Sequence, residues 1–231
     1  MAIVRIGAFG GSCLLPAAFE SEEEIARAIA ENPQLLVADG AAPPVLVTQR
    51  LILPDATLDL LFLDMRSIPI VVESRLAKSD GCRREIVAQV IDDLSALAQL
   101  TVAQLDDAAG GAVERALRNV AGNNRHDFDA RWTSLAVNLR AARVKFIVAI
   151  DELSPSMDRQ IRFLAEHSDL DVQCVALAKF RDPSGETYYV PVARVPSPKA
   201  IWPRRGFAHY EFTRRGGTRP IDHAERVHWD G

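Results

Sequence analysis

Cysteine is scarce in this chain of 231 residues, which contains only three. Cys13, Cys82 and Cys174 are scattered, odd in number and without a Cys-x-x-Cys spacing. This pattern argues against a disulfide framework and against a zinc site built on paired cysteines. A reduced, cytoplasmic setting is therefore expected.

Long hydrophobic runs are also missing. No apolar stretch approaches the length of about 18 residues that marks a candidate membrane-spanning helix. The N-terminus has no charged segment followed by an apolar one, so we expect neither a signal peptide nor a membrane partner.

An excess of positive charge is absent as well. The formal net charge is -4, from 27 Lys and Arg against 31 Asp and Glu. This balance excludes a uniformly basic nucleic-acid binder but leaves room for a local basic surface. With 48% hydrophobic residues, the chain is long enough to bury a sizeable core as one domain, with or without an appendage.

Two acids stand out inside apolar strands. In Leu58–Leu63 every residue except Asp59 is strongly apolar, as in a strand that is covered on both faces. A second strand is expected over residues 68–76, where alternation places Glu73 and Arg75 on one face. A buried carboxylate is costly unless it is paired, so Asp59 needs a partner.

A hairpin register supplies that partner. Residues opposite each other in an antiparallel pair share a face, so Asp59 meets Glu73 if Asp64 lies opposite Ile68. This register predicts a three-residue loop, Met65–Ser67. Two opposed carboxylates raise each other's pKa unless a cation lies between them. Mg²⁺ or Mn²⁺ is the expected ion, since hard divalent cations prefer oxygen ligands.

An earlier helix, expected over residues 21–31, carries a third candidate acid. Ser21 is the predicted N-cap, and Glu24 is predicted to complete a capping box. Glu22 falls on the buried side of this helix, whereas Glu23 and Glu24 are expected to face solvent. Glu22 has two interpretations: a favourable charge at the helix N-terminus, or the first acid of the site.

A later amphipathic helix begins near Ser79 and carries Gln89 and Asp93 along one edge of its apolar face. From that edge, Gln89 is expected to reach toward the site and Asp93 to pair with Arg75. The alternative is an ordinary amphipathic helix on which Gln89 is only solvated.

In this order, the pieces resemble the PD-(D/E)XK nuclease superfamily, and within it the NucS-like (DUF91-type) endonuclease domain. The matching segments are Ser21–Ile25, Asn32–Leu36, Leu58–Asp64, Val72–Arg75 and Gln89. The resemblance implies an α/β fold of the restriction-endonuclease-like type, with a central mixed sheet flanked by helices on both faces. It also implies a Mg²⁺-dependent enzyme that hydrolyses phosphodiester bonds of DNA.

The resemblance assigns roles to individual residues. Asp59, Glu73 and the Ser74 carbonyl would ligate the metal ion, and Glu22 would act on it directly or through water. Arg75 would stabilise the charge of the phosphorane, and Gln89 would orient groups around it.

Two positions depart from the family pattern. Arg75 stands where the family has lysine, and Asp93 stands where it has tyrosine. Arginine keeps its charge but is larger, planar and always protonated. Lys78 is a candidate substitute for the missing lysine, but its odd offset from Arg75 places it on the opposite strand face unless the strand has ended or bulged.

Three hypotheses follow from these departures. In the first, Arg75 neutralises the transition state while the metal supplies hydroxide. In the second, the domain is a catalytically inactive nuclease-like module that binds DNA or a protein partner. In the third, the acids are structural parts of an ordinary α/β protein. An Arg75 that forms a two-pronged pair with Glu73 or Asp93 and so fills the metal position favours the second. An open position between the Asp59 and Glu73 oxygens, occupied by an ion or water, favours the first.

The rest of the chain completes one domain and adds a tail. A strand-helix-strand pattern beyond residue 144 extends the sheet, so we assign residues 1–195 to the nuclease-like domain. Residues 196–231 carry seven basic and four acidic side chains among several aromatic ones. Such a tail suits contact with DNA phosphates and unstacked bases. It equally suits docking on its own domain or on a second subunit of a homodimer.

Overall fold

The structure is a computed structural model that describes residues 3–7, 10–38, 40–78 and 82–195, with two short strands at 210–212 and 218–220. The chain divides into two compact units, Met1–Ser197 and Pro198–Gly231. The first unit contains every candidate site residue.

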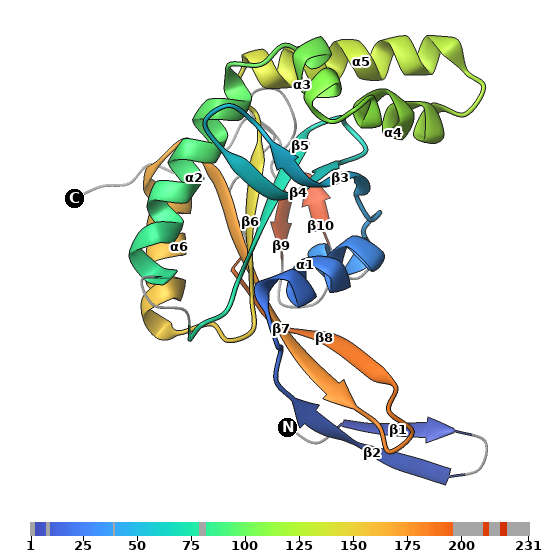
Figure 1. Ribbon diagram of the computed structural model, residues 1–231, viewed down its shortest axis with the longest axis vertical. Helices are drawn as coiled ribbons and strands as arrows, with labels where there is room; N and C mark the ends of the chain where they lie inside the picture. The colour runs from blue at the N-terminus through green and yellow to red at the C-terminus, as the bar shows by residue number, and fades with distance from the viewer. Residues whose placement is uncertain are drawn as a thin grey trace. The chain divides into compact units, whose positions relative to one another are not determined.

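An eight-stranded mixed sheet forms the centre of the first unit (Figure 1). Its strands are β1 (Ile3–Gly7), β2 (Gly10–Ala17), β3 (Val45–Ile52), β4 (Thr57–Leu63), β5 (Pro69–Arg75), β6 (Lys145–Ile150), β7 (Asp171–Arg181) and β8 (Thr187–Val195). Seven of them follow the order β1-β2-β7-β6-β5-β4-β3, and β8 pairs with β7. The chain runs antiparallel through β3, β4 and β5, whereas β5, β6 and β7 are parallel.

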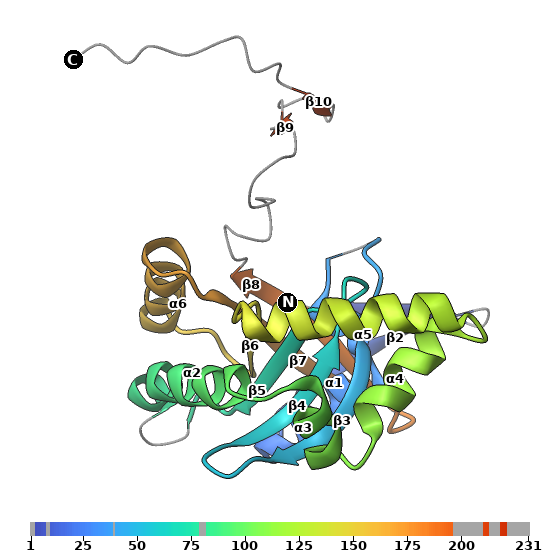
Figure 2. The same cartoon turned by 90° about the horizontal axis from the view of Figure 1, so that it is seen from above.

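Helices cover both faces of this sheet (Figure 2). On one face lie α1 (Glu22–Glu31) and the short 3-10 helix η1 (Pro33–Leu36). The other face carries α2 (Cys82–Ala98), α3 (Val102–Ala108), α4 (Ala112–Ala121), α5 (Arg125–Arg140) and α6 (Pro155–His167). The predicted α/β fold, a central mixed sheet flanked by helices on both faces, is confirmed.

Alternation along the central strands divides the core into two layers. Leu60 and Val72 pack with α1, whereas Leu61 and Val71 pack with the helices of the opposite face. Because both faces are covered, nearly every side chain of β4 and β5 is buried, which explains their continuous apolar sequence. Asp59 and Glu73 have the parity of Leu61 and Val71.

The predicted hairpin register is confirmed. Leu60 pairs with Val72 and Leu63 pairs with Pro69, a register that continues to Asp59 opposite Glu73. At the other end, the Asp64 amide donates to the Ile68 carbonyl at 3.1 Å. The loop therefore spans three residues, Met65–Ser67, as expected.

Local hydrogen bonds explain this loop. The Ser67 amide donates to the Asp64 carbonyl at 2.9 Å, and Ser67 has a φ of 57°. A turn that ends in a left-handed residue is the common form of a three-residue hairpin loop. The Asp64 carboxylate accepts the amides of Arg66 and Ile68, and Asn138 of α5 donates to the carbonyls of Arg66 and Ser67.

The start of α1 corrects one expectation. Ser21 is its N-cap, since the hydroxyl accepts the Glu24 amide at 3.3 Å. Glu24, however, does not face solvent: it is 8% exposed and forms an ion pair with Lys179 of β7. Its carboxylate accepts the Glu20 amide at 2.8 Å. The expectation failed because a lysine from a distant strand supplies the missing charge.

The second unit contains an antiparallel pair of short strands, β9 (Tyr210–Phe212) and β10 (Thr218–Pro220). The side chains of residues 196–231 lie outside the described residues, so the two interpretations of the tail stay predictions. Among the described helices, none has both the length and the apolar character that a membrane span requires.

Candidate functional site

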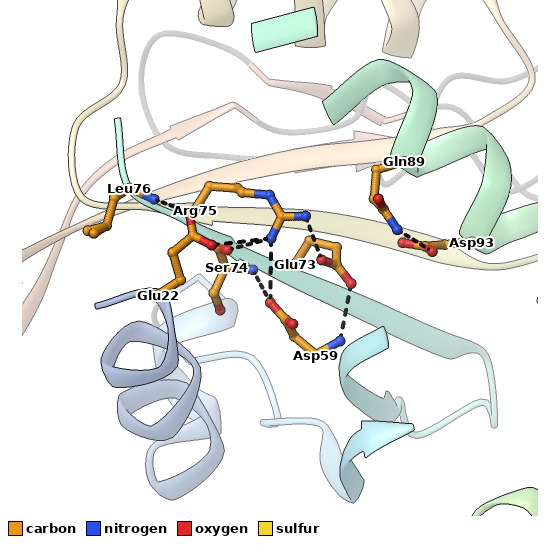
Figure 3. A network of polar contacts seen from close by, with 8 residues as sticks. All are labelled: Glu22, Asp59, Glu73, Ser74, Arg75, Leu76, Gln89 and Asp93. Atoms are coloured by element: carbon orange, nitrogen blue, oxygen red, sulfur yellow. Dashed lines mark hydrogen bonds and ion pairs between the residues drawn. The ribbon is translucent and has the colours of Figure 1, made fainter. Parts of the chain in front are cut away.

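The predicted site residues come together at one end of the β4–β5 hairpin (Figure 3). Glu22 comes from the first turn of α1, Asp59 from β4, Glu73 and Arg75 from β5, and Asp93 from α2. We call these five residues the Arg75 cluster. Gln89 and Ser74 contribute a side-chain amide and a backbone group beside it.

Asp59 and Glu73 are held by backbone amides of the facing strand. The Asp59 amide donates to Glu73 Oε1 at 3.1 Å, and the Ser74 amide donates to Asp59 Oδ2 at 2.8 Å. Regular strand pairing extends to Leu60 and Val72. The carboxylates of Asp59 and Glu73 supply the hydrogen bonds between the strands just beyond that point. One oxygen of each carboxylate is thereby fixed, which orients both groups toward Arg75.

The Arg75 guanidinium lies among the atoms that were predicted to ligate a metal. Nη2 is 3.2 Å from Glu73 Oε2, and Nη1 donates to the Ser74 carbonyl at 2.8 Å. Nη1 is also 3.9 Å from Asp59 Oδ2 and 3.7 Å from Glu22 Oε2. The group therefore spans several oxygens instead of forming a two-pronged pair with a single carboxylate.

Glu22 belongs to the cluster as well as to its helix. Its Oε1 accepts the Leu76 amide at 3.1 Å, directly beyond the end of β5. This bond joins the start of α1 to the strand that carries Glu73 and Arg75. The placement favours the interpretation of Glu22 as a site acid, while its position in the first turn also suits the helix dipole.

Asp93 and Gln89 form the side of the site that α2 contributes. Gln89 Nε2 donates to Asp93 Oδ1 at 2.7 Å, so Gln89 is not merely solvated. Asp93 is completely buried, and its Oδ2 has no hydrogen-bond partner within the described part of the chain. The expected pairing with Arg75 is corrected, because Arg75 contacts the carboxylates of the strands and of α1 instead.

Burial shifts the protonation of these acids. It raises the pKa of Glu73 to about 8, with a further rise from the Asp59 charge, while the Asp59 amide and Arg75 act in the opposite direction. Burial also raises the pKa of Asp93 to about 6, against the Gln89 hydrogen bond. The pKa of Asp59 is raised by burial, although the Ser74 amide opposes the rise. The cluster thus contains four carboxylates and one guanidinium, which contacts three of the four.

An open pocket of about 620 Å³ gives solvent access to Asp59, Glu73, Arg75 and Gln89. Its rim includes the β3–β4 turn at residues 53–57 and two further acids, Asp55 and Asp92. Sequence reasoning missed both acids. The sequence indicated these acids only by their positions: Asp55 lies shortly before β4, and Asp92 is the neighbour of Asp93.

A third acid that sequence reasoning missed lies at the exit of β5. Asp151, which follows β6, accepts the Ala77 amide at 2.7 Å through Oδ1 and so fixes the exit of β5. Lys78 lies beyond the strand end and is exposed. No described contact joins Lys78 to the cluster, so it does not replace the expected lysine.

The donor set is partly suited to a divalent ion. Carboxylate and carbonyl oxygens are the ligands that Mg²⁺ prefers, and the surplus of negative charge would be relieved by a cation. In the described residues, however, no group of three or more His, Cys, Asp or Glu is arranged to hold a metal ion. The guanidinium lies among the same oxygens, so a metal ion requires Arg75 to move.

Comparisons with protein-family models, with curated proteins and with solved structures find no match to this chain. The nuclease resemblance therefore stays a prediction from the motifs.

Proposed function

We propose that this chain is a metal-dependent endonuclease that hydrolyses phosphodiester bonds of DNA. One observation carries the proposal: three carboxylates contact a single guanidinium beside an open pocket, where burial raises the pKa of Glu73 to about 8. Strongly perturbed pKa values that arise from burial and neighbouring charges cluster at functional sites. The surplus of negative charge suits a divalent cation and a phosphate brought in with it.

In this proposal the strands hold the ion. Asp59, Glu73 and the Ser74 carbonyl would ligate Mg²⁺ or Mn²⁺, and Glu22 would bind it directly or through water. The ion lowers the pKa of its bound water and offsets the charge of the phosphate. Gln89 orients groups at the pocket wall, where it already donates to Asp93.

Arg75 has a separate task in this proposal. Its guanidinium stays protonated at any physiological pH and presents several N–H donors in a plane. It would therefore donate to non-bridging phosphate oxygens and stabilise their charge, without exchanging a proton with the attacking water. A bound ion, with Glu73 among its ligands, would supply the hydroxide.

The test measures Mg²⁺- or Mn²⁺-dependent nicking of single-stranded, branched and duplex DNA by the purified chain. Asp59→Ala is expected to reduce cleavage by on the order of 100-fold or more, because it removes a ligand of the ion. Asp158→Ala is the matched control, since Asp158 pairs only with Arg162 of α6 among the described contacts. Cleavage that is unchanged in Asp59→Ala would contradict the proposal.

A second function is favoured by the position of Arg75. Its guanidinium contacts Glu73, Asp59, Glu22 and the Ser74 carbonyl, and so takes the place predicted for the metal. A chain in which Arg75 stays there permanently would be an inactive nuclease-like module that binds DNA or a protein partner. It would bind DNA equally well with and without a chelator and would leave the DNA uncut. Metal-dependent cleavage by the wild-type chain rules this alternative out.

A further inference from the structure

A second pocket lies where the chain turns back between α4 and α5 (Figure 1). Its volume is about 850 Å³, and we call it the Arg118 pocket. It contains no residue of the Arg75 cluster. The side chains that matter for its chemistry are Arg118 and Asn119 of α4, Asn123 of the connecting loop, and Arg125, Phe128 and Asp129 of α5.

Arg118 rests on an aromatic ring at this pocket. Its Cζ lies 4.4 Å from the centroid of the Phe128 ring, a distance at which a guanidinium and a ring attract each other. Glu114 holds Arg118 in place, because Nε and Nη2 lie 2.7 and 2.6 Å from Glu114 Oε1. Phe128 in turn contacts the Trp132 ring and packs against the core.

This arrangement leaves a fixed planar group open to solvent. Phe128 covers one side of the guanidinium, yet the Arg118 side chain is still 58% exposed. Arginine planes and aromatic rings are the surfaces on which unstacked nucleobases stack in complexes with proteins. The Arg118 pocket therefore has a stacking surface that is in place before any ligand binds.

Three polar side chains beside this surface have no partner within the described part of the chain. Asn119, Asn123 and Arg125 are exposed, and no hydrogen bond or ion pair is described for them. An asparagine amide both donates and accepts, which suits the edge of a base. Arg125 supplies a charge for a phosphate, although it is the first residue of α5, where the helix dipole disfavours a cation.

The balance of charge argues against a site for a bare anion. Glu114 already neutralises Arg118, and Asp129 in the pocket wall offsets the charge of Arg125. A pocket with little net charge attracts a free anion weakly. It suits a neutral planar base that carries one phosphate, since an inorganic anion or an acidic peptide would leave the stacking surface unused.

We propose that the Arg118 pocket binds one unpaired base of a nucleic acid strand. The base stacks on Arg118, the amides of Asn119 and Asn123 contact its edge, and Arg125 contacts its phosphate. This inference does not rest on the proposed function, because it requires neither a metal ion nor cleavage. In a DNA endonuclease, such a pocket would favour substrates that contain a single-stranded segment.

The experiment measures fluorescence anisotropy of a labelled single strand of about ten nucleotides, titrated with the full chain in a chelator. Arg118→Ala is expected to weaken binding on the order of tenfold, because the base loses its stacking surface. Asn119→Ala should have a smaller effect of the same sign. A duplex of the same sequence should lose less affinity, since its bases are already paired and stacked. The same strand as RNA is titrated in parallel, and the strand that loses more affinity in Arg118→Ala is the one that the pocket takes.

Arg162→Ala is the matched control. Arg162 forms the same kind of ion pair with the acid four residues before it, on the exposed surface of α6, and no contact with an aromatic ring is described for it. An equal loss in Arg162→Ala, or equal losses for single strands and duplexes, would overturn the inference, because either result would reflect charge alone.

Two further measurements complete the test. Competition compares inorganic phosphate with a nucleoside monophosphate, and equal displacement of the labelled strand by the two would overturn the inference. Asn119→Ala covers the case in which Arg118→Ala folds poorly, since Asn119 is exposed and makes no described contact. A wild-type chain that binds no single strand would also overturn the inference, whereas nicking of duplex DNA with Mg²⁺ tests the proposed function separately.

Discussion

Two polar clusters join α1 to the central sheet, and they differ in how their charges are matched. Glu24 and Lys179 form one cluster, in which one acid meets one base with 8% and 2% of their surfaces exposed. Burial acts to raise the pKa of Glu24, but the bonds to Lys179 and to the Glu20 amide outweigh it, so the pKa is lowered. The charges of this pair match one to one.

The Arg75 cluster is not matched in that sense. Its four acids outnumber its one guanidinium, which contacts three of them. The pKa of Glu73 rises to about 8, and one oxygen of Asp93 has no hydrogen-bond partner among the described residues. Both clusters combine acidic and basic side chains, but the ratio of acids to bases differs. A matched pair needs nothing from outside, whereas a surplus of acid at an open pocket calls for a cation.

The largest expected effect comes from breaking the matched pair. Lys179→Met leaves the Glu24 carboxylate buried without a cation, so we expect the free energy of unfolding to fall by about 3–5 kcal/mol. Chemical denaturation measures this change, with Lys78→Met as an exposed control. Mn²⁺ binding, measured under conditions in which the variant is fully folded, should be unaffected. A Lys179→Met protein as stable as the wild type would contradict the conclusion that the Glu24–Lys179 ion pair stabilises the folded chain.

The next prediction concerns how the free energy of unfolding depends on pH, which should distinguish the Arg75 cluster from the Glu24–Lys179 pair. In the folded chain without divalent ions, Glu73 keeps its proton up to about pH 8, whereas its ordinary value is 4.5. The folded state therefore binds more protons between these values, and stability should fall as pH rises through this window, by up to about 1.4 kcal/mol per unit. Asp93, with a pKa raised to about 6, adds a loss of the same sign.

Glu73→Gln should flatten that dependence and raise the melting temperature at pH 8. The measurement is a series of thermal melts from pH 5 to pH 9 in a chelator. Glu24→Gln is the informative partner variant, since the pKa of Glu24 is lowered and its loss should destabilise the chain at neutral pH. An identical pH profile for wild type and Glu73→Gln would contradict the electrostatic account of the cluster.

The smallest effect concerns a matched pair that is less buried. Lys145 Nζ lies 2.7 Å from Asp64 Oδ2 beside the hairpin loop, with side-chain exposures of 25% and 18%. Because solvent screens this pair, Lys145→Met should cost about 1 kcal/mol or less in urea denaturation. A loss as large as that of Lys179→Met would show that burial does not set the difference between the pairs.

The hairpin was predictable from local rules. Side chains alternate along a strand, and the loop length sets the register, so Asp59 had to face Glu73 once the loop was three residues long. The N-cap Ser21 followed from a similar short-range signal. The mixed sheet flanked by helices on both faces was expected from the family resemblance.

The partners of the buried charges were not predictable in that way. Glu24 was expected in solvent because its own helix offers no reason for burial, and its partner Lys179 lies far along the chain. Asp93 was expected to hold Arg75, yet the carboxylates of α1, β4 and β5 hold it instead. Several acids were plausible partners for one guanidinium, and only their distances distinguish them.

Residue order was enough to bring Asp59, Glu73 and Arg75 to one end of a hairpin, because the strand period and the loop length act over neighbouring residues. The balance of charge there is a tertiary property. It depends on α1 and α2 delivering Glu22 and Asp93 from distant parts of the chain, and on how much water each carboxylate loses when they do.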